Sequence, residues 1–141
     1  MTPERFEIIE HTADIGIRAR GRNLAELFEN AAAGMFTIMA DKDALKASEA
    51  VRVSAAASSP DELLAAWLEE LLYLSEAREV LFRRVEVREA RERLVAGVAR
   101  GAPLQENRDA LRHEIKAVTY HLLEVREDPE GGWTCQAIFD V

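Results

Sequence analysis

The chain of 141 residues is long enough to bury a hydrophobic core and has the size of a single domain. Its 18 basic and 26 acidic side chains give a net charge of −8, which argues against a protein that coats nucleic acid and suits one that binds a basic partner or a cation. A single cysteine excludes an intrachain disulfide, and the chain shows neither a signal peptide nor an apolar run of membrane-spanning length, so we expect a cytoplasmic protein.

The start of the chain predicts a β-hairpin followed by an amphipathic helix. Apolar and polar residues alternate over 5–10 and 15–20, which predicts two short strands joined by an HTAD turn. Asn23 is a typical N-cap, with Glu26 as its capping-box partner. Apolar residues at helical spacing then predict a helix that ends near Asp41.

The middle of the chain predicts a strand, a second helix and a hairpin. The strand lies around 51–53, and the helix opens with Ser59 as N-cap and Pro60 at its first position. Residues 80–90 and 91–101 alternate as the two strands of a hairpin with charged outer faces.

The last third of the chain predicts a loop and a second hairpin. Residues 101–113 follow neither periodicity and predict an exposed loop, and 114–128 pairs with 133–141 around a PEGG turn. Together these elements predict one α+β domain over 1–141, a mainly antiparallel sheet with two helices on one face.

Common catalytic motifs are absent from the sequence. It contains no glycine-rich phosphate loop, no CxxC pair and no HExxH motif, which argues against a nucleotide-binding enzyme and a zinc site. Cys135 alternates with Trp133 and Ala137, so we interpret it as a small buried hydrophobic residue.

Acidic groups at two strand ends form a candidate cation site. Asp140 and the α-carboxylate of Val141 adjoin each other, and Asp14 would join them if its strand paired with the last one. Hard divalent cations prefer such oxygen clusters. The alternative is that Asp14 is a turn residue and Asp140 a solvated strand end, and on pattern alone this is the commoner case.

Three further polar residues are candidates for a site: His11, His121 and Lys116. His11 precedes the turn and is placed to donate to a carboxylate there, whereas His121 is expected to face solvent or to bond across the sheet. Lys116 lies in a predicted strand between Ile115 and Ala117, and a surface lysine is its simplest interpretation.

Five stretches of the chain resemble the archease family. HTADIGIRARG followed by NLAELFENAAAGMFTIMAD resembles the opening of the family, and DELLAAWLEELLYL, EIKAVTYH and IFDV resemble its later landmarks. They occur in the family's order and cover nearly the whole chain. The departure is GAPLQENRDALRH, where the family usually has a GE-type turn.

The resemblance implies a fold, a function and a site. It implies an α+β fold with a strand–helix–strand–strand module. It also implies a non-catalytic partner of the GTP-dependent tRNA-splicing RNA ligase that promotes guanylylation of the ligase's active-site histidine and so its multiple turnover. Asp14, Asp140 and Val141 would bind a divalent cation. Ca²⁺ is the first expectation, and Mg²⁺ or Mn²⁺ are the alternatives. Lys116 and His11 would contribute to ligase activation. The protein would not bind nucleic acid strongly and would not associate with a membrane.

Two other functional classes are alternatives. The chain could be a chaperone or adaptor for a nucleic-acid-modifying enzyme, with a purely structural metal site. A stand-alone metal-dependent hydrolase is disfavoured because the sequence offers no convincing nucleophile or general base.

Overall fold

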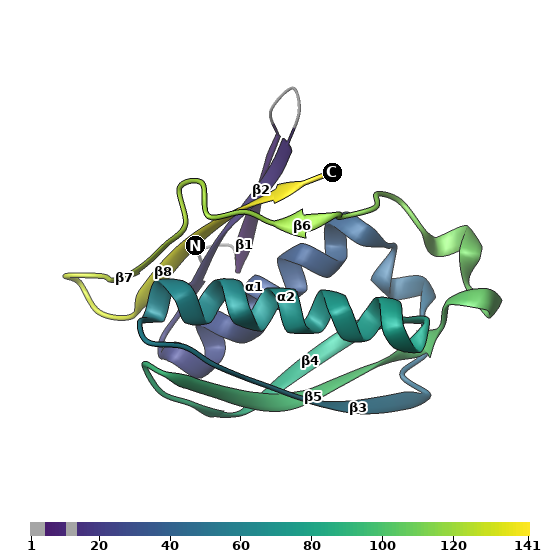
Figure 1. Ribbon diagram of the computed structural model, residues 1–141, viewed down its shortest axis with the longest axis horizontal. Helices are drawn as coiled ribbons and strands as arrows, with labels where there is room; N and C mark the ends of the chain where they lie inside the picture. The colour runs from purple at the N-terminus through teal and green to yellow at the C-terminus, as the bar shows by residue number, and fades with distance from the viewer. Residues whose placement is uncertain (1–4, 11–13) are drawn as a thin grey trace.

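Two helices lie between two antiparallel sheets in the computed structural model, which describes residues 5–10 and 14–141 (Figure 1). The helices and strands follow in this order: β1 (Phe6–Glu10), β2 (Asp14–Gly21), α1 (Leu24–Met39), η1 (Lys42–Ala44), β3 (Glu49–Ala56), α2 (Pro60–Arg78), β4 (Val80–Ala90), β5 (Leu94–Pro103), η2 (Leu104–Glu106), η3 (Arg108–Ala110), β6 (Ala117–Val118), β7 (Glu124–Glu127) and β8 (Trp133–Asp140). Within the described residues, no helix is both long and apolar enough to cross a membrane.

The predicted α+β class and antiparallel pairing are confirmed, but the strands divide between two sheets where a single sheet was predicted. The larger sheet has the order β1-β2-β8-β6, with β7 also paired to β8, and the smaller has the order β3-β5-β4. Each sheet has one face toward the helices (Figure 1). The consecutive elements β3, α2, β4 and β5 form a strand–helix–strand–strand unit, as the resemblance implies.

Both helices begin at the predicted caps. The Asn23 side chain accepts a hydrogen bond from the backbone N–H of Glu26 at 2.9 Å, and the Ser59 hydroxyl accepts one from Glu62 at 3.3 Å. The Glu26 carboxylate accepts from the backbone N–H and the guanidinium of Arg22. Local side-chain chemistry therefore sets where each helix starts.

Large aromatic side chains join the layers of the core. Trp67 of α2 is fully buried, and its indole N–H donates to the carbonyl of Phe28 in α1 at 3.1 Å. The rings of Phe36 and Phe82 meet edge to face at 5.3 Å, which ties α1 to β4. Cys135 is buried in β8, as predicted, and burial raises the pKa of its thiol to about 12.

The predicted exposed loop over 101–113 is only partly correct. Strand β5 continues to Pro103, and two short 3-10 helices follow it. Ala110 is buried, and its carbonyl accepts from the backbone N–H of Asp41 at 2.8 Å. The N–H of Arg112 donates to the carbonyl of Met39, where α1 ends two residues earlier than expected. Such long-range backbone contacts leave no periodic trace in the sequence.

The predicted strand over 114–128 is interrupted in the structure. Val118 pairs with Phe139 and Glu124 with Gln136, so the five residues 119–123 stand opposite only two residues of β8. The backbone N–H of Thr119 still donates to the carbonyl of Ile138 at 2.9 Å, but 119–123 form an excursion from the regular ladder, in which Leu122 has a φ of 54° in the left-handed region. The turn that closes the hairpin with β8 lies where it was predicted.

Candidate functional site

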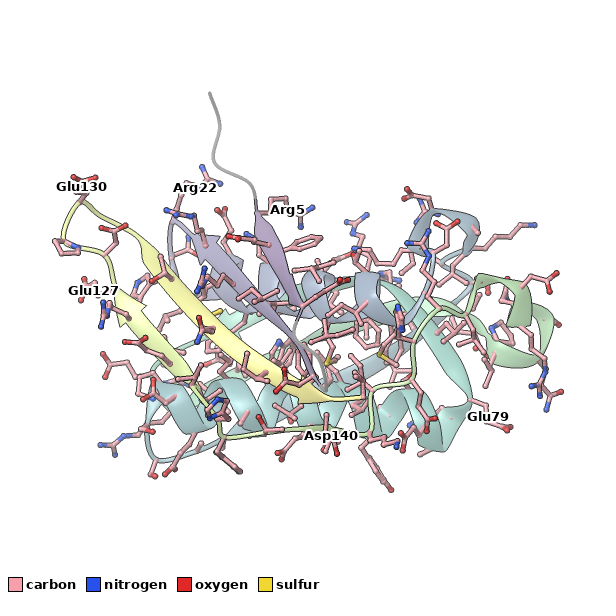
Figure 2. The ribbon with its side chains drawn as sticks, turned by 90° about the horizontal axis from the view of Figure 1, so that it is seen from above. Arg5, Arg22, Glu79, Glu127, Glu130 and Asp140 are labelled. Atoms are coloured by element: carbon pink, nitrogen blue, oxygen red, sulfur yellow. The ribbon has the colours of Figure 1, made fainter. Side chains whose placement is uncertain are left out.

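The two aspartates predicted to hold a cation face each other across the larger sheet. Strands β2 and β8 are antiparallel, and their register pairs Asp14 with Asp140. Side chains of directly opposed residues point to the same face of a sheet, with their Cβ atoms about 4.5–5.5 Å apart. The condition under which Asp14 could join Asp140, pairing of its strand with the last strand, is therefore met. Figure 2 shows Asp140 at the end of the yellow strand β8.

The alternation of β2 explains why Asp14 points away from the core. Ile15 and Ile17 are buried against the helices, so the residues between and beside them lie on the opposite face. On that face the next pair is Gly16 and Ile138. A Cβ atom on Gly16 would lie 2.5 Å from Cδ1 of Ile138, so glycine leaves room for this buried isoleucine side chain. An apolar contact thus adjoins the aspartates.

One oxygen of Asp14 has no hydrogen-bond partner among residues 5–10 and 14–141. Its Oδ1 is buried and accepts no hydrogen bond from any described residue. A buried carboxylate oxygen opposite a second carboxylate is costly unless a proton or a cation compensates it. The orphaned oxygen and the paired carboxylates fit a hard cation, whose preferred ligands are charged oxygens.

Two carboxylates alone do not complete a cation site. Among residues 5–10 and 14–141, no group of three or more His, Cys, Asp and Glu side chains is arranged to hold a metal ion. The nearest additional main-chain oxygens along the sequence belong to Val141. This residue follows Asp140 and is half-buried. We define Asp14, Asp140 and Val141 as the acidic corner. Its cation ligation stays a prediction.

Lys116 adjoins the acidic corner through its backbone. Its N–H donates to the carbonyl of Asp140 at 2.8 Å, and the next residue, Ala117, pairs with Asp140 in the sheet. Asp140 therefore lies between Asp14 on one neighbouring strand and the Lys116 segment on the other. The Lys116 residue is exposed just before β6, and its ammonium makes no salt bridge within the part of the chain described.

The two histidine candidates have different outcomes. His11 lies outside the described residues, so its predicted role stays a prediction. His121 is exposed in the 119–123 excursion, where its backbone N–H donates to the Thr119 hydroxyl at 3.3 Å. The predicted solvent-facing position of His121 is confirmed. Tyr120 and Leu122 beside it are 67% and 57% exposed, although the strand pattern placed them within the sheet.

A second polar region was not predicted from the sequence. Arg5, Lys42 and Arg83 line one pocket, although they come from three separate segments of the chain. No spacing or motif connects them, and arginine and lysine at isolated positions normally indicate solvated surface. Only the packing of α1 and β4 brings these segments together.

Comparison with known proteins identifies a family over almost the whole chain. The model of the Archease protein family (MTH1598/TM1083) matches residues 6–141. The chain is 37% identical to the protein archease of Methanosarcina mazei over 142 residues, covering 98% of this chain and 97% of that protein. It is 36% identical to the protein archease of Methanopyrus kandleri, covering 96% and 99%.

Solved structures agree with this relationship. The solution structure of Methanobacterium thermoautotrophicum protein 1598 has a TM-score of 0.79 and 34% identity, covering 97% of this chain and 99% of that one. The crystal structure of an archease described as a possible chaperone, from Thermotoga maritima, shares the fold with a TM-score of 0.65 at 22% identity, covering 94% of each chain. The chain belongs to the archease protein family.

Proposed function

We propose that this chain is a non-catalytic activator of the GTP-dependent tRNA-splicing RNA ligase. On this proposal it binds the ligase as a protein partner in the cytoplasm and promotes guanylylation of the ligase's active-site histidine. The ligase then completes many rounds of tRNA splicing or RNA repair. The observation that carries the proposal is family membership over residues 6–141, with Asp14 and Asp140 paired at one sheet end.

The acidic corner supplies the chemistry that this role needs. Transfer of a guanylyl group to histidine places negative charge on the departing diphosphate, and positive charge near those oxygens lowers the barrier. We propose that Asp14, Asp140 and a main-chain oxygen of Val141 hold a divalent cation. A cation bound there would supply Lewis acidity toward phosphate oxygens. The orphaned Oδ1 of Asp14 supports this assignment.

We propose that Lys116 supplies a second positive charge beside the acidic corner. Its backbone bond to Asp140 holds the segment against the corner, while its exposed side chain extends from the edge of the sheet. We propose that its ammonium contacts a phosphate oxygen or an acidic side chain of the ligase, since ammonium groups donate in several directions. His11 is proposed to assist from the turn that precedes Asp14. With a net charge of −8, the chain is not expected to bind RNA strongly by itself.

A chaperone or adaptor for a nucleic-acid-modifying enzyme is the second candidate. The Thermotoga maritima archease is described as a possible chaperone, and the exposed Tyr120 and Leu122 offer apolar contact area. On this alternative the cation would only tie the end of β8 to β2. The ligase would then gain solubility or yield but not turnover.

A ligation assay with limiting ligase separates these functions. Ligase at about a tenth of the RNA concentration, with GTP and 3′-phosphate RNA, should complete one round alone and many rounds with this protein. A second assay should show faster formation of guanylylated ligase from purified, fully soluble enzyme. Ligation by this protein without ligase, or an unchanged number of turnovers, would contradict the proposal. An increased yield of soluble ligase with unchanged guanylylation would favour the chaperone.

A further inference from the structure

A cationic pocket lies away from the acidic corner. Its volume is about 350 Å³, and its walls come from the start of the chain, α1, the turn that follows α1, and β4. Four basic residues line it: Arg5, Lys42, Arg83 and Arg84. In a chain of net charge −8, this concentration of positive charge calls for an explanation.

Neutral acceptors hold three of these cations in place. Arg5 donates to the Oδ1 of Asn30, which is 4% exposed, at 2.9 Å. Lys42 donates to the carbonyl of Ala33 at 3.3 Å, and Arg83 donates to that of Leu45 at 2.6 Å. None of the three forms a salt bridge with a carboxylate among the described residues. Their positions are therefore fixed while their charges stay uncompensated by direct ion pairs.

The acids that line the pocket are mostly engaged elsewhere. Glu29 accepts from the backbone N–H of Val87 at 2.8 Å. Glu86 is bound by three arginines, one of which, Arg84, also lines the pocket. Asp43 is exposed on the turn after α1. These carboxylates reduce the positive field but do not pair with Arg5, Lys42 or Arg83.

The position of Lys42 supports an anionic ligand. Burial lowers the pKa of Lys42, Arg5 lowers this pKa further, Asp43 opposes the change and Arg83 adds to it. The ammonium also lies 5.8 Å from the ring centroid of Phe6. A half-buried lysine that is repelled by two guanidinium groups is stabilised when an anion binds between them.

We propose that the pocket formed around Arg5, Lys42 and Arg83 binds a phosphate-bearing anion of about diphosphate size. Phosphate oxygens accept from guanidinium and ammonium groups in charge-assisted hydrogen bonds, and guanidinium binds them in a bidentate manner. The site is separate from the acidic corner, because Phe6 and Asp14 lie at opposite ends of the β1–β2 hairpin. Figure 2 shows Arg5 beside the start of β1.

Calorimetric titration with inorganic diphosphate tests the proposal on the purified chain, without ligase or RNA. Saturable binding is expected for the wild type and should weaken at higher ionic strength. Lys42→Met and Arg83→Gln should each reduce the affinity by about tenfold or more, since each removes charge-assisted hydrogen bonds. Lys46→Met is the matched control, because it removes the same charge from an exposed lysine four residues away.

Nucleotide arms identify the source of the anion. If GDP binds more tightly than diphosphate, the pocket takes the phosphate chain of a nucleotide; equal or weaker binding of GDP assigns a free diphosphate. The wild type binding neither ligand at millimolar concentration would overturn the proposal. An equal loss in Lys42→Met and Lys46→Met would also overturn it, because binding would then follow net charge. Arg5→Gln serves as a further variant, and thermal unfolding verifies that each variant is folded.

Discussion

The two ends of the β1–β2 hairpin carry opposite charge and are assembled in different ways. At one end, Asp14 and Asp140 are opposed by the register of adjacent strands. At the other end, the cationic pocket collects Arg5, Lys42 and Arg83 from three segments that share no strand pairing. Sheet register alone is sufficient to place the two aspartates side by side. The cationic pocket instead depends on helix and loop packing, and each of its side chains needs its own hydrogen-bond acceptor.

The two regions also compensate their charge differently. Arg5, Lys42 and Arg83 each donate at least one hydrogen bond to a neutral oxygen, so each of these three cations has a polar partner without a ligand. At the acidic corner, Oδ1 of Asp14 has no partner among the described residues. The acidic corner should therefore depend more strongly on its ligand than the cationic pocket does.

The largest expected effect is on cation affinity at the acidic corner. Asp14→Asn and Asp140→Asn should each weaken the binding of Ca²⁺, Mg²⁺ and Mn²⁺ by about tenfold or more, because cation affinity depends on the number of charged oxygens. Without cation, Asp14→Asn should unfold at an equal or higher temperature than the wild type, since it removes the charge of a carboxylate whose buried Oδ1 has no partner among the described residues. Calorimetry and thermal unfolding measure both effects.

Asp109→Asn provides the matched control for these variants. Asp109 is exposed on a 3-10 turn away from the larger sheet, so its substitution should leave cation affinity unchanged. Extending the chain beyond Val141 tests the third ligand, because added residues would crowd the corner. Equal affinities in the wild type, both corner variants and the extended chain would show that the corner holds no cation.

A smaller effect is expected from Lys116→Ala. Removing the ammonium should slow ligase guanylylation several-fold at saturating protein, because one charge near the phosphates is lost. The free energy of unfolding should change by less than about 0.5 kcal/mol, as is usual for an exposed side chain. Lys46→Ala, another exposed lysine, should activate like the wild type. Activation by Lys116→Ala at the wild-type rate would assign Lys116 to the solvated surface.

The smallest effect is expected on the pH dependence of stability at the cationic pocket. The pKa of Lys42 is lowered in the folded state, mainly by burial, so its charged form is destabilising below this pKa. That cost disappears as pH rises through the folded pKa toward the ordinary lysine value. Lys42→Met should therefore raise the unfolding temperature at pH 7 and lose this advantage near pH 11.

Two features allow the stability of Lys42→Met to be compared directly with that of the wild type. The carbonyl of Ala33 also accepts from the Thr37 hydroxyl at 2.8 Å, so Lys42→Met leaves no buried acceptor unpaired. Lys46→Met should show no such pH-dependent difference from the wild type. A constant difference between Lys42→Met and wild type from pH 7 to pH 11 would contradict a lowered Lys42 pKa.

Local chemistry was sufficient to predict where the helices start, where most strands lie, and that Asp14 and Asp140 are candidate cation ligands. Asn23 and Ser59 cap their helices by accepting hydrogen bonds from the backbone N–H groups of residues three positions later. The residue types and spacing that favour such caps can be read from the sequence. Strand alternation over 15–20 predicted that Ile15, Ile17 and Ala19 would share one face, and all three are buried in the structure. The resemblance of five stretches to one family indicated which acids belong together, and pattern alone left this open.

Long-range packing accounts for what the sequence did not reveal. The strands divide between two sheets because each helix has apolar residues on more than one side, and no local pattern states which strand each side will meet. The 119–123 excursion depends on the pairing of β6 and β7 with one strand, β8. The cationic pocket depends on how the segments of Arg5, Lys42 and Arg83 converge. Such contacts join residues far apart in the chain, and their energies come from packing, which periodicity and capping rules do not encode.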